Sequence, residues 1–280
     1  MTLAKHNVKE EVGKKLGEYR PLQLMAEGPF GAVWSGENDA GEPRALKILP
    51  AADDPSTRLE IRAIQLIAKL DHHNLLLPEK VFSVDKFFVV AMPMADGSLQ
   101  DYFEAYLSER GTGIDPVELC QLLTQAALGL DFLNVQKHHL GSWPSGIQHC
   151  NVKPTNLLLF GDKIKVTDFN IASPTARAVQ FGQRINVPAY TAPEVFHGRL
   201  SNQTDQYSLA ATYVYLRGGR PPFSTVPEPG QLPYLRPAPD LSMLTAKERP
   251  IIAKALASAP PERWKTCGEL LAKLSEAVRG

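Results

Sequence analysis

Strand-like patterns dominate the first third of the chain. In residues 44–49 polar and apolar positions alternate, which places Ala45, Lys47 and Leu49 on one face of a strand. Residues 87–92 form a continuous apolar run, which is typical of a strand that is buried on both sides or covered by a helix. Both segments indicate a sheet in this part of the chain.

A helix is expected between these two strands. Asp54 is a candidate N-cap and Pro55 a candidate first helical residue, and both residue types favour a helix start. The apolar residues behind them recur at helical spacing and form one stripe: Leu59, Ala63, Leu66, Ile67 and Leu70. This pattern predicts a helix that buries one face.

Beyond residues 96–98 the pattern changes from strands to helices. Apolar residues trace one long buried helical face from about Pro116 to His138. Short strands are expected at 157–160 and 164–167, and further helices at about 203–217, 246–257 and 267–278. This order predicts a small sheet-rich lobe and a larger helical lobe, with a seam near residue 95.

Composition narrows the class of protein. Of the 280 residues, 44% are hydrophobic and 21% charged, which is typical of a globular chain, and 30 Lys+Arg balance 30 Asp+Glu. A neutral chain has no net attraction to nucleic acid or to an anionic membrane. No apolar run approaches the roughly 18–20 residues of a membrane helix, and three widely spaced cysteines exclude a disulfide framework. We therefore expect a cytoplasmic protein with no nucleic-acid partner and no membrane partner.

Two early features have both a chemical and a structural interpretation. Glycines let backbone N–H groups approach phosphate oxygens, so the segment Glu27-Gly28-Pro29-Phe30-Gly31-Ala32-Val33 is a candidate phosphate loop. Two glycines three residues apart also fit an ordinary hairpin turn. Likewise, Lys47 is either a functional cation or a solvated charge at the edge of a sheet.

Three later segments are more specific. His149-Cys150-Asn151-Val152-Lys153-Pro154-Thr155-Asn156 lies just before the short strand pair, and the second strand leads into Asp168-Phe169-Asn170. Pro188-Ala189-Tyr190-Thr191-Ala192-Pro193-Glu194 follows. Taken in order, these segments resemble the protein kinase family, of the serine/threonine type. The resemblance runs from about Tyr19 to Lys273 and includes Asp205-Gln206-Tyr207-Ser208-Leu209-Ala210 and Pro261-Glu262-Arg263-Trp264.

The resemblance implies a fold and a domain organisation. The fold is of the α+β class: a two-lobed protein kinase-like fold with a small β-rich N-lobe and a larger helical C-lobe. Residues 1–18 are expected to be an N-terminal extension and residues 19–280 the kinase-like domain. The N-lobe is expected at about 19–94 and the C-lobe at about 95–280.

The resemblance also implies that ATP and Mg²⁺ bind and assigns residues to them. Lys47 matches the strand lysine that holds the α- and β-phosphates, and Glu60 is its candidate partner, although an exposed glutamate near a helix start is the alternative. Asn156 and Asp168 match the two magnesium ligands, and Asn151 and Lys153 match the catalytic positions. Other nucleotide contacts are expected from Gly28, Gly31, Val33, Ala45, Met92, Ala95 and Leu158. Structural roles are expected for His149, Phe169, Glu194, Asp205 and Arg263.

Four residues depart from the family's pattern. Asn151 occupies the position of the catalytic aspartate, and an amide oxygen cannot take a proton at neutral pH. Asn170 replaces the glycine after Asp-Phe, Val187 replaces a threonine that ties the substrate platform to the catalytic residues, and Ala26 replaces the first loop glycine. In addition, Cys150 replaces the arginine that would bind a phosphorylated activation segment.

These departures leave three hypotheses for the function. The first is a pseudokinase, a domain that binds ATP and Mg²⁺, transfers phosphate poorly and acts through a protein partner of unknown identity. The second is a slow serine/threonine kinase that acts on protein hydroxyls. The third is a protein-interaction module that binds no nucleotide.

Overall fold

The computed structural model describes residues 14–28, 31–50, 55–135, 138–139, 144–169, 172–174, 188–223 and 236–280. These residues form two compact units. The first unit contains the described residues up to 71 together with 76–95, and the second contains 72–75 and the described residues from 96 to 280. The segment 72–75 thus belongs to the second unit, although the first unit surrounds it in the sequence.

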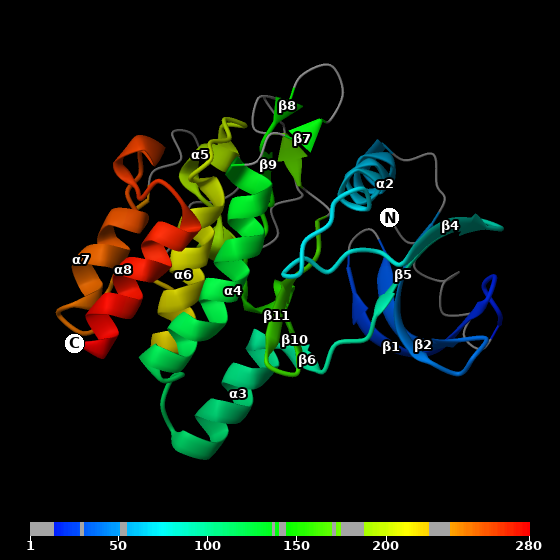
Figure 1. Ribbon diagram of the computed structural model, residues 1–280, viewed down its shortest axis with the longest axis horizontal. Coiled ribbons are helices and arrows are strands. Elements are labelled where there is room, and N and C mark those ends of the chain that lie inside the picture. The colour runs from blue at the N-terminus through cyan, green and yellow to red at the C-terminus, as the bar shows by residue number, and fades with distance from the viewer. Residues whose placement is uncertain are drawn as a thin grey trace. The chain divides into compact units, whose positions relative to one another are not determined.

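The first unit is a five-stranded antiparallel sheet with one helix (Figure 1). The strand order is β1-β2-β3-β5-β4, so β1 and β4 are the edges. The strands are β1 (Tyr19–Glu27), β2 (Ala32–Asn38), β3 (Pro43–Pro50), β4 (Lys80–Val84) and β5 (Phe87–Pro93). The helix is α2 (Pro55–Ile67), as the apolar stripe predicts, although Asp54 lies outside the described residues and Leu70 lies beyond the helix end.

The two faces of this sheet have separate apolar clusters. On one face Trp34, Leu46 and Val89 pack with Leu16, which is only 2% exposed. The packed unit therefore begins before residue 19, inside the segment expected to be an extension. On the other face Leu49, Phe88 and Val90 pack with Ile64 of α2. The apolar run at 87–92 is thus buried on both sides, since its residues alternate between the two clusters.

Short strands in the second unit position the loops that matter for chemistry. β10 (Leu157–Phe160) pairs with β11 (Lys163–Val166) and with β6 (Gly97–Ser98). β9 (Ile147–Gln148) pairs with β12 (Ser173–Pro174), and β7 (His138–His139) with β8 (Pro144–Ser145). One isolated bridge joins Leu75 to Val166, which ties the segment 72–75 to β11.

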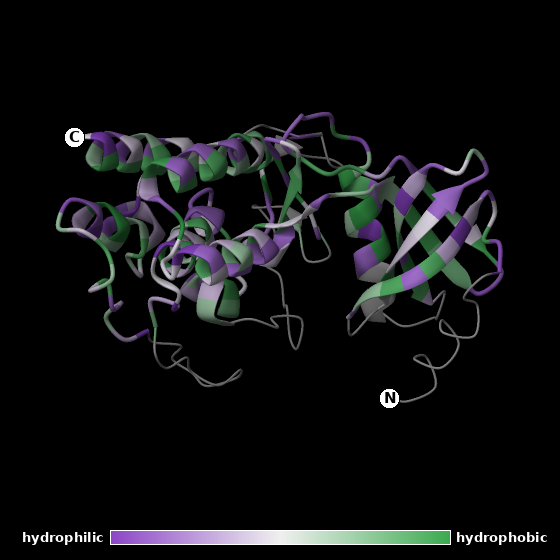
Figure 2. Cartoon of the chain, turned by 90° about the horizontal axis from the view of Figure 1, so that it is seen from below, coloured by the Kyte–Doolittle hydropathy of each residue, from purple (hydrophilic) through white to green (hydrophobic). Residues whose placement is uncertain are grey.

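Helices make up most of the second unit. They are α3 (Leu99–Arg110), α4 (Pro116–Val135), α5 (Pro193–Phe196), α6 (Thr204–Gly218), α7 (Glu248–Ala255) and α8 (Cys267–Arg279). Single 3-10 turns occur at 154–156, 188–190 and 260–262. α4 packs against both α6 and α8, as Figure 1 shows. α8 is amphipathic and carries both hydrophobic and hydrophilic residues (Figure 2). Its buried face consists of Cys267, Leu270, Leu271 and Leu274.

Two expected helix boundaries are wrong. α4 ends at Val135 and His138 is in β7, because the polar run after Val135 no longer supports the apolar stripe. α7 is shorter than 246–257, since Ala246 and Lys247 lie in a turn before the helix and Leu256 in a turn after it. In addition, α3 was not expected. Its start is fixed by a capping box, in which the Ser98 hydroxyl accepts from the Asp101 N–H and the Asp101 carboxylate accepts from the Ser98 N–H.

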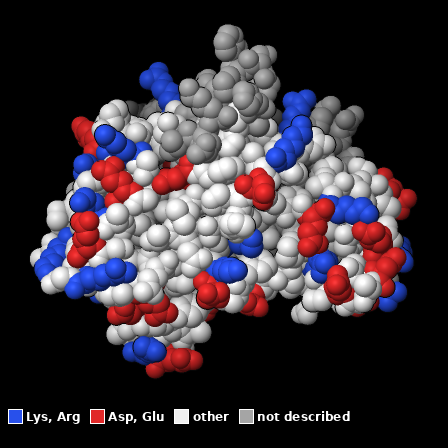
Figure 3. All heavy atoms as spheres, viewed as in Figure 1, with Lys and Arg blue, Asp and Glu red and all other residues white. Residues whose placement is uncertain are grey.

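Positively and negatively charged residues are mixed on the surface. On the face shown in Figure 3, Lys and Arg are interspersed with Asp and Glu, in keeping with the neutral composition. Among the described residues, no helix combines the length and the apolarity that crossing a membrane requires.

Candidate functional site

Lys47 and Glu60 form an ion pair within the first unit. Lys47 lies on β3 and Glu60 in the second turn of α2, and Lys47 Nζ is 2.7 Å from Glu60 Oε1. Glu60 is only 1% exposed, and its Oε2 atom has no hydrogen-bond partner among the described residues. Burying a charged group is costly unless an opposite charge pairs with it. The pairing that the sequence suggested is therefore present, and Glu60 is not an exposed surface charge.

Three apolar side chains share the face of the sheet on which Lys47 lies. In the strand register Val33 lies opposite Lys47, and Ala45 opposite Met92. Ala45 and Lys47 are two residues apart on one strand, so their side chains point to the same face. All three apolar residues are half-buried. The first unit thus presents small apolar groups beside one paired cation, which suits a flat aromatic ring next to a phosphate group.

The glycines of the candidate phosphate loop have different surroundings. Gly28 N–H donates to the Gly31 carbonyl at 2.8 Å, which closes a turn between β1 and β2, while Pro29 and Phe30 lie outside the described residues. A Cβ on Gly31 would lie 2.5 Å from the Ile48 carbonyl oxygen, whereas a Cβ on Gly28 would meet nothing closer than 3.5 Å. Gly31 is thus required by the neighbouring strand, independently of any phosphate.

The remaining two candidate nucleotide contacts lie in different units. Ala95 ends the first unit just after β5, and Leu158 lies on β10 of the second unit. Leu158 pairs with Lys165 and with Ser98 in the small sheet. Both residues are half-buried.

His149 anchors the loop that follows β9. Its ring Nε2 contacts the Thr167 carbonyl at 2.8 Å, and its Nδ1 accepts the Asn151 N–H at 3.1 Å. These two contacts favour a neutral imidazole with the proton on Nε2. The ring is fully buried and meets Phe169 edge-on, with ring centroids 5.0 Å apart. Burial lowers the pKa of His149, so the ring stays uncharged.

Asp205, which lies on α6, binds the backbone of the same loop. Its carboxylate oxygens accept the N–H groups of His149 at 2.7 Å and Cys150 at 2.8 Å. In the amide orientation that satisfies its neighbours, Asn134 donates a further hydrogen bond to Asp205 at 2.8 Å. Asp205 is fully buried, and burial raises its pKa. These contacts hold Cys150 in the left-handed backbone region at φ 63°, which a non-glycine residue seldom adopts.

Asn151 and Asp168 are in direct contact. Asn151 Nδ2 donates to Asp168 Oδ2 at 2.8 Å, although 17 residues separate them in the sequence. The Asn151 carbonyl oxygen accepts from Asn156 Nδ2 at 2.7 Å. Asp168 has a left-handed backbone at φ 67°. The loop therefore brings together Asn151, Asn156 and Asp168, three of the residues that the sequence singled out.

The oxygen donors in this group fit a magnesium ion. Asn156 uses its amide nitrogen to bind the Asn151 carbonyl, so its amide oxygen, which accepts a long contact from the Thr155 hydroxyl at 3.5 Å, is the atom that could bind a metal. Asp168 supplies a carboxylate that contacts the same Asn151. Mg²⁺ is usually bound through one or two protein oxygens and completed by phosphates and water. Among the described residues, no group of three or more His, Cys, Asp or Glu side chains could hold a metal by itself. The donor set thus suits a metal that arrives with a phosphate.

Lys153 completes the loop as its only cation. It is half-buried, and within the described part of the chain no carboxylate forms an ion pair with it. Its charge opposes protonation of His149 and contributes to that residue's lowered pKa. Because residue 151 is the neutral Asn151, no carboxylate lies two residues before Lys153 in the sequence.

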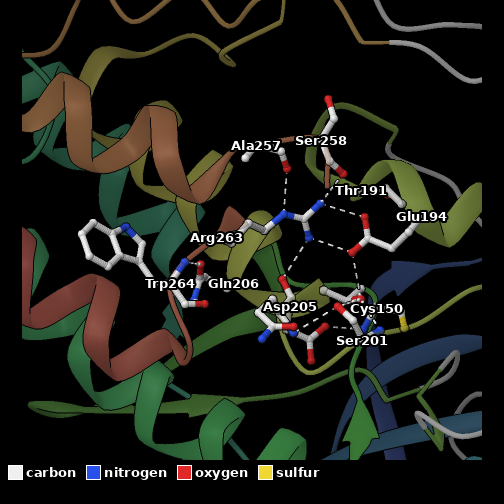
Figure 4. A network of polar contacts seen from close by, with 12 residues as sticks. Cys150, Thr191, Glu194, Ser201, Asp205, Gln206, Ala257, Ser258, Arg263 and Trp264 are labelled. Carbon is white, nitrogen blue, oxygen red and sulfur yellow. Dashed lines mark hydrogen bonds and ion pairs between the residues drawn. The ribbon is translucent and has the colours of Figure 1, made fainter. Parts of the chain in front are cut away.

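Glu194 and Arg263 form a buried two-armed ion pair (Figure 4). Arg263 Nη1 lies 2.7 Å from Glu194 Oε1, and Nη2 lies 2.8 Å from Oε2. The Arg263 side chain is fully buried, and its Nε donates to the Ala257 carbonyl at 2.8 Å. Thr204 adds a hydroxyl donor to Glu194 at 3.0 Å. The pairing expected between these two residues is thus present, and Figure 4 shows Arg263 between the 257–258 loop and the start of α5.

Comparison with known proteins identifies the family. Residues 19–265 match the protein kinase domain family. The chain belongs to the protein kinase family. The β-sheet unit is its N-lobe and the helical unit its C-lobe, in agreement with the two-lobed fold that the sequence predicted.

The relatives of this kinase domain include bacterial and plant proteins. The chain is 31% identical to the serine/threonine-protein kinase PknI of Mycobacterium tuberculosis over 94% of its own length and 42% of the relative's. It is 28% identical to the PTI1-like tyrosine-protein kinase 3 of Arabidopsis thaliana over 79% of its length and 56% of the relative's. A crystal structure of the M. tuberculosis PknI kinase domain matches with a TM-score of 0.71 at 26% identity, covering 95% of this chain and 98% of that chain. The chain thus spans about half or less of the curated relatives but matches an isolated kinase domain almost throughout.

Some predicted features of the kinase domain lie outside the described residues. These are Asn170 and Val187. The structural consequences of these two departures from the family's pattern therefore stay predictions from the sequence.

The sequence missed several residues that support the described site. Thr204 and Asn134 bond to Glu194 and Asp205, and Gln206 links α6 to the carbonyls of Trp264 at 2.8 Å and Thr266 at 2.7 Å. Thr204 and Gln206 flank the motif residue Asp205, which is the one signal that pointed to them. Asn134 lies next to the buried Leu133 on α4 and is itself buried, and a polar residue at such a position indicates a buried hydrogen bond without naming its partner.

Proposed function

We propose that this protein kinase domain binds ATP with Mg²⁺, transfers phosphate very slowly or not at all, and acts as a pseudokinase through a protein partner. Serine/threonine kinases are among its relatives, but the position that accepts the substrate's proton holds an amide. The proposal separates two properties, nucleotide binding and phosphate transfer, that an active kinase combines.

The contact between Asn151 and Asp168 carries the proposal. Asn151 directs its N–H donor at the Asp168 carboxylate, 2.8 Å away, so its side chain acts there as a hydrogen-bond donor. An amide has no basic site at neutral pH. A positioned general base typically contributes about 10²–10⁴ to a rate. The residue at the acceptor-activating position is thus engaged with the metal-ligand carboxylate and is unable to take a proton.

Other residues support retention of the nucleotide. Lys47 is held by a buried carboxylate, and Asn156 and Asp168 supply oxygen donors for a metal. When bound, ATP supplies the γ-phosphoryl group, and magnesium neutralises part of the phosphate charge. Lys47 then binds phosphate oxygens and Ala45, Val33 and Met92 contact the base, whereas Asn151 has no means of removing the hydroxyl proton of an acceptor.

A weakly active serine/threonine kinase is the second candidate, and Lys153 favours it. This lysine has no ion-pair partner within the described part of the chain, so its charge is available to a transferred phosphoryl group. Under this alternative Asn151 orients the hydroxyl and the proton leaves to phosphate or solvent. A protein-interaction module that binds no nucleotide is the third candidate. A measurement of ATP binding distinguishes it from the first two.

Two measurements test the proposal. Titration calorimetry with ATP in the presence of magnesium should show binding, and transfer of γ-phosphate to a generic protein acceptor should be at least about 10²-fold slower than in Asn151→Asp. The double variant Asn151→Asp/Asn170→Gly extends the comparison, and Asp162→Asn in the β10–β11 turn is the matched control. If the unaltered protein transfers phosphate as fast as Asn151→Asp, the pseudokinase assignment is wrong. If ATP at millimolar concentration neither binds nor raises the melting temperature, the interaction module takes its place.

A further inference from the structure

Two arginines hold the segment 191–194 from distant places in the sequence. Arg263 binds the Glu194 carboxylate through both of its terminal nitrogens, at 2.7 and 2.8 Å. Arg236 Nη2 donates to the Thr191 carbonyl oxygen at 2.5 Å, across 45 residues. Thr191 is only 6% exposed, and a buried carbonyl oxygen needs a donor within the protein. The segment is thus held by its side chain at one end and by its backbone at the other.

Both arginines lie over the ring of Tyr207, a buried residue of α6. The Cζ atom of Arg263 is 4.9 Å from the ring centroid, and that of Arg236 is 5.9 Å from it. Arg236 also lies 4.8 Å from the ring centroid of Phe223, and the planes of the two rings are 2° apart. A planar guanidinium group stacks on aromatic rings, which an ammonium group does not do. The rings therefore restrict where the Arg236 guanidinium can lie and so direct it at Thr191.

The helix α6 connects this segment with the loop 149–151. At the start of the helix, the Thr204 hydroxyl donates to Glu194 at 3.0 Å. The next residue, Asp205, accepts two backbone N–H groups of the loop 149–151, at 2.7 and 2.8 Å. Consecutive residues of one helix thus hold the segment and the loop. The position of the segment relative to residue 151 is therefore set by α6 and by the contacts that bind the segment to it.

We propose that Arg236 is a positioning residue, which together with Arg263 fastens the segment 191–194 to α6 and so fixes its place relative to Asn151. Position 151 is where an acceptor hydroxyl is presented under the proposed function, and the inference rests on that function for the acceptor. Its conformational part is independent, because it concerns contacts among residues of the C-lobe. Loss of Arg236 releases the backbone end of the segment while the Arg263–Glu194 pair still holds the other end.

Hydrogen exchange of the full chain tests this role. Four amides that follow Thr191 report on the segment, because the N–H groups of residues 195, 197, 198 and 199 donate to carbonyl oxygens between 192 and 195. In Arg236→Met, which has a long side chain without donors or charge, these amides should exchange at least about tenfold faster, while the amides of α4 keep their rates. Arg236→Lys should restore only part of the protection, since an ammonium group donates but does not stack.

Arg249→Met is the matched control. Arg249 also donates to backbone carbonyl oxygens, those of Ser242 at 3.1 Å and Leu244 at 2.9 Å, but both acceptors lie within seven residues of it. Its loss should leave exchange at 191–199 unchanged. Unaltered exchange of these amides in Arg236→Met would overturn the proposal. Equal acceleration in the segment and in α4 would also overturn it, because Arg236 would then stabilise the C-lobe in general.

The second test measures the acceptor. In the Asn151→Asp background, Arg236→Met should lower kcat/KM for a generic protein acceptor at least about tenfold and change the KM for ATP by less than about twofold. An unchanged kcat/KM for the acceptor, or an equal effect on both substrates, would contradict the positioning role. If Asn151→Asp neither binds ATP nor transfers phosphate, the proposed function fails, while hydrogen exchange still decides whether Arg236 holds the segment.

Discussion

The Lys47 ammonium group reaches the Glu60 carboxylate at 2.7 Å, although only 13 residues separate the two in the sequence. The connection is short because α2 begins at Pro55, five residues after β3 ends at Pro50. Glu60 therefore lies near the start of its helix and still faces the sheet. The buried pair makes the position of Lys47 depend on the docking of α2 against β3 and β5.

Lys47→Met should weaken ATP binding at least about tenfold, because a cation that binds phosphate oxygens is lost. The same change strands a buried carboxylate, so the free energy of unfolding should also fall by about 3–5 kcal/mol. The double variant Lys47→Met/Glu60→Gln separates the two effects, since the glutamine carries no charge. Calorimetry should still show weak ATP binding in the double variant, while its melting temperature should recover most of the loss. Unchanged ATP affinity in both variants would contradict the role of Lys47.

Arg263→Ala should destabilise the C-lobe strongly. The substitution leaves Glu194 buried without its partner and removes donors to several carbonyl oxygens. We expect a loss of about 3–5 kcal/mol in the free energy of unfolding, measured by urea denaturation. Lys273→Ala is the matched control, because Lys273 forms an exposed pair with Glu276 and its loss should change stability by less than about 0.5 kcal/mol. Similar midpoints for the two variants would show that the buried pair contributes little.

In Asp168→Ala, nucleotide binding should no longer depend on magnesium. Within the described residues, the Asp168 carboxylate is the charged oxygen donor of the group in which Asn151 contacts both Asp168 and Asn156. Calorimetry of ATP with and without magnesium measures the effect directly. Asp162→Ala, in the exposed turn between β10 and β11, serves as the control and should leave the dependence as it is. A dependence that persists in Asp168→Ala would assign the metal to other ligands.

Stability should decrease as the pH rises above about 9, because three cysteine thiols are buried and uncharged. Burial raises the pKa of Cys120 to about 11 and raises those of Cys150 and Cys267. Since each folded-state pKa is raised, the full stabilisation is present below the unfolded-state pKa and is lost as pH rises toward the folded-state value. Melting temperatures at about pH 8 and pH 10.5 should therefore differ less in Cys120→Ala than in the unaltered protein. An identical pH dependence in the two proteins would exclude a contribution from Cys120.

The two loop glycines should respond differently to alanine. Gly31→Ala places a Cβ 2.5 Å from the Ile48 carbonyl oxygen and should lower the melting temperature, whereas Gly28→Ala meets no atom closer than 3.5 Å and should be tolerated. Each variant is also the control for the other, because both change the same turn by one methyl group. A larger loss of stability in Gly28→Ala than in Gly31→Ala would refute this assignment.

Much of the fold could be predicted from the spacing of apolar residues. Periodicity gave the central strands, α2 and the long buried face of α4, because each of these elements buries a continuous stripe. The two-residue strands β6 to β9 were beyond this reasoning, since such strands exist only through their partners. The missed helix α3 is a different case. Leu99, Phe103 and Tyr106 have helical spacing and Ser98 begins a capping box, so the signal was present in the sequence.

The residues of the site could be predicted from the sequence motifs, but the contacts between them could be predicted less well. The ordered motifs pointed to Asn151, Asn156 and Asp168, and the family match extends over the segment that contains them. The direction of the Asn151 amide was not predictable, because it depends on where Asp168 lies after β11 and on the fixed tautomer of His149. Glu60 was identified as a candidate, but its burial became evident only with the packing of α2 on the sheet.

The backbone of the loop at 149–151 is held by the Asp205 carboxylate on α6, and not by the side chain of Asn151. Asp205 binds the backbone N–H groups of His149 and Cys150, so these contacts do not involve the side chain at position 151. Exchanging one oxygen for one nitrogen at that side chain removes a proton acceptor and leaves the scaffold intact. A loss of the proton acceptor at position 151 is therefore compatible with an intact backbone scaffold around the loop.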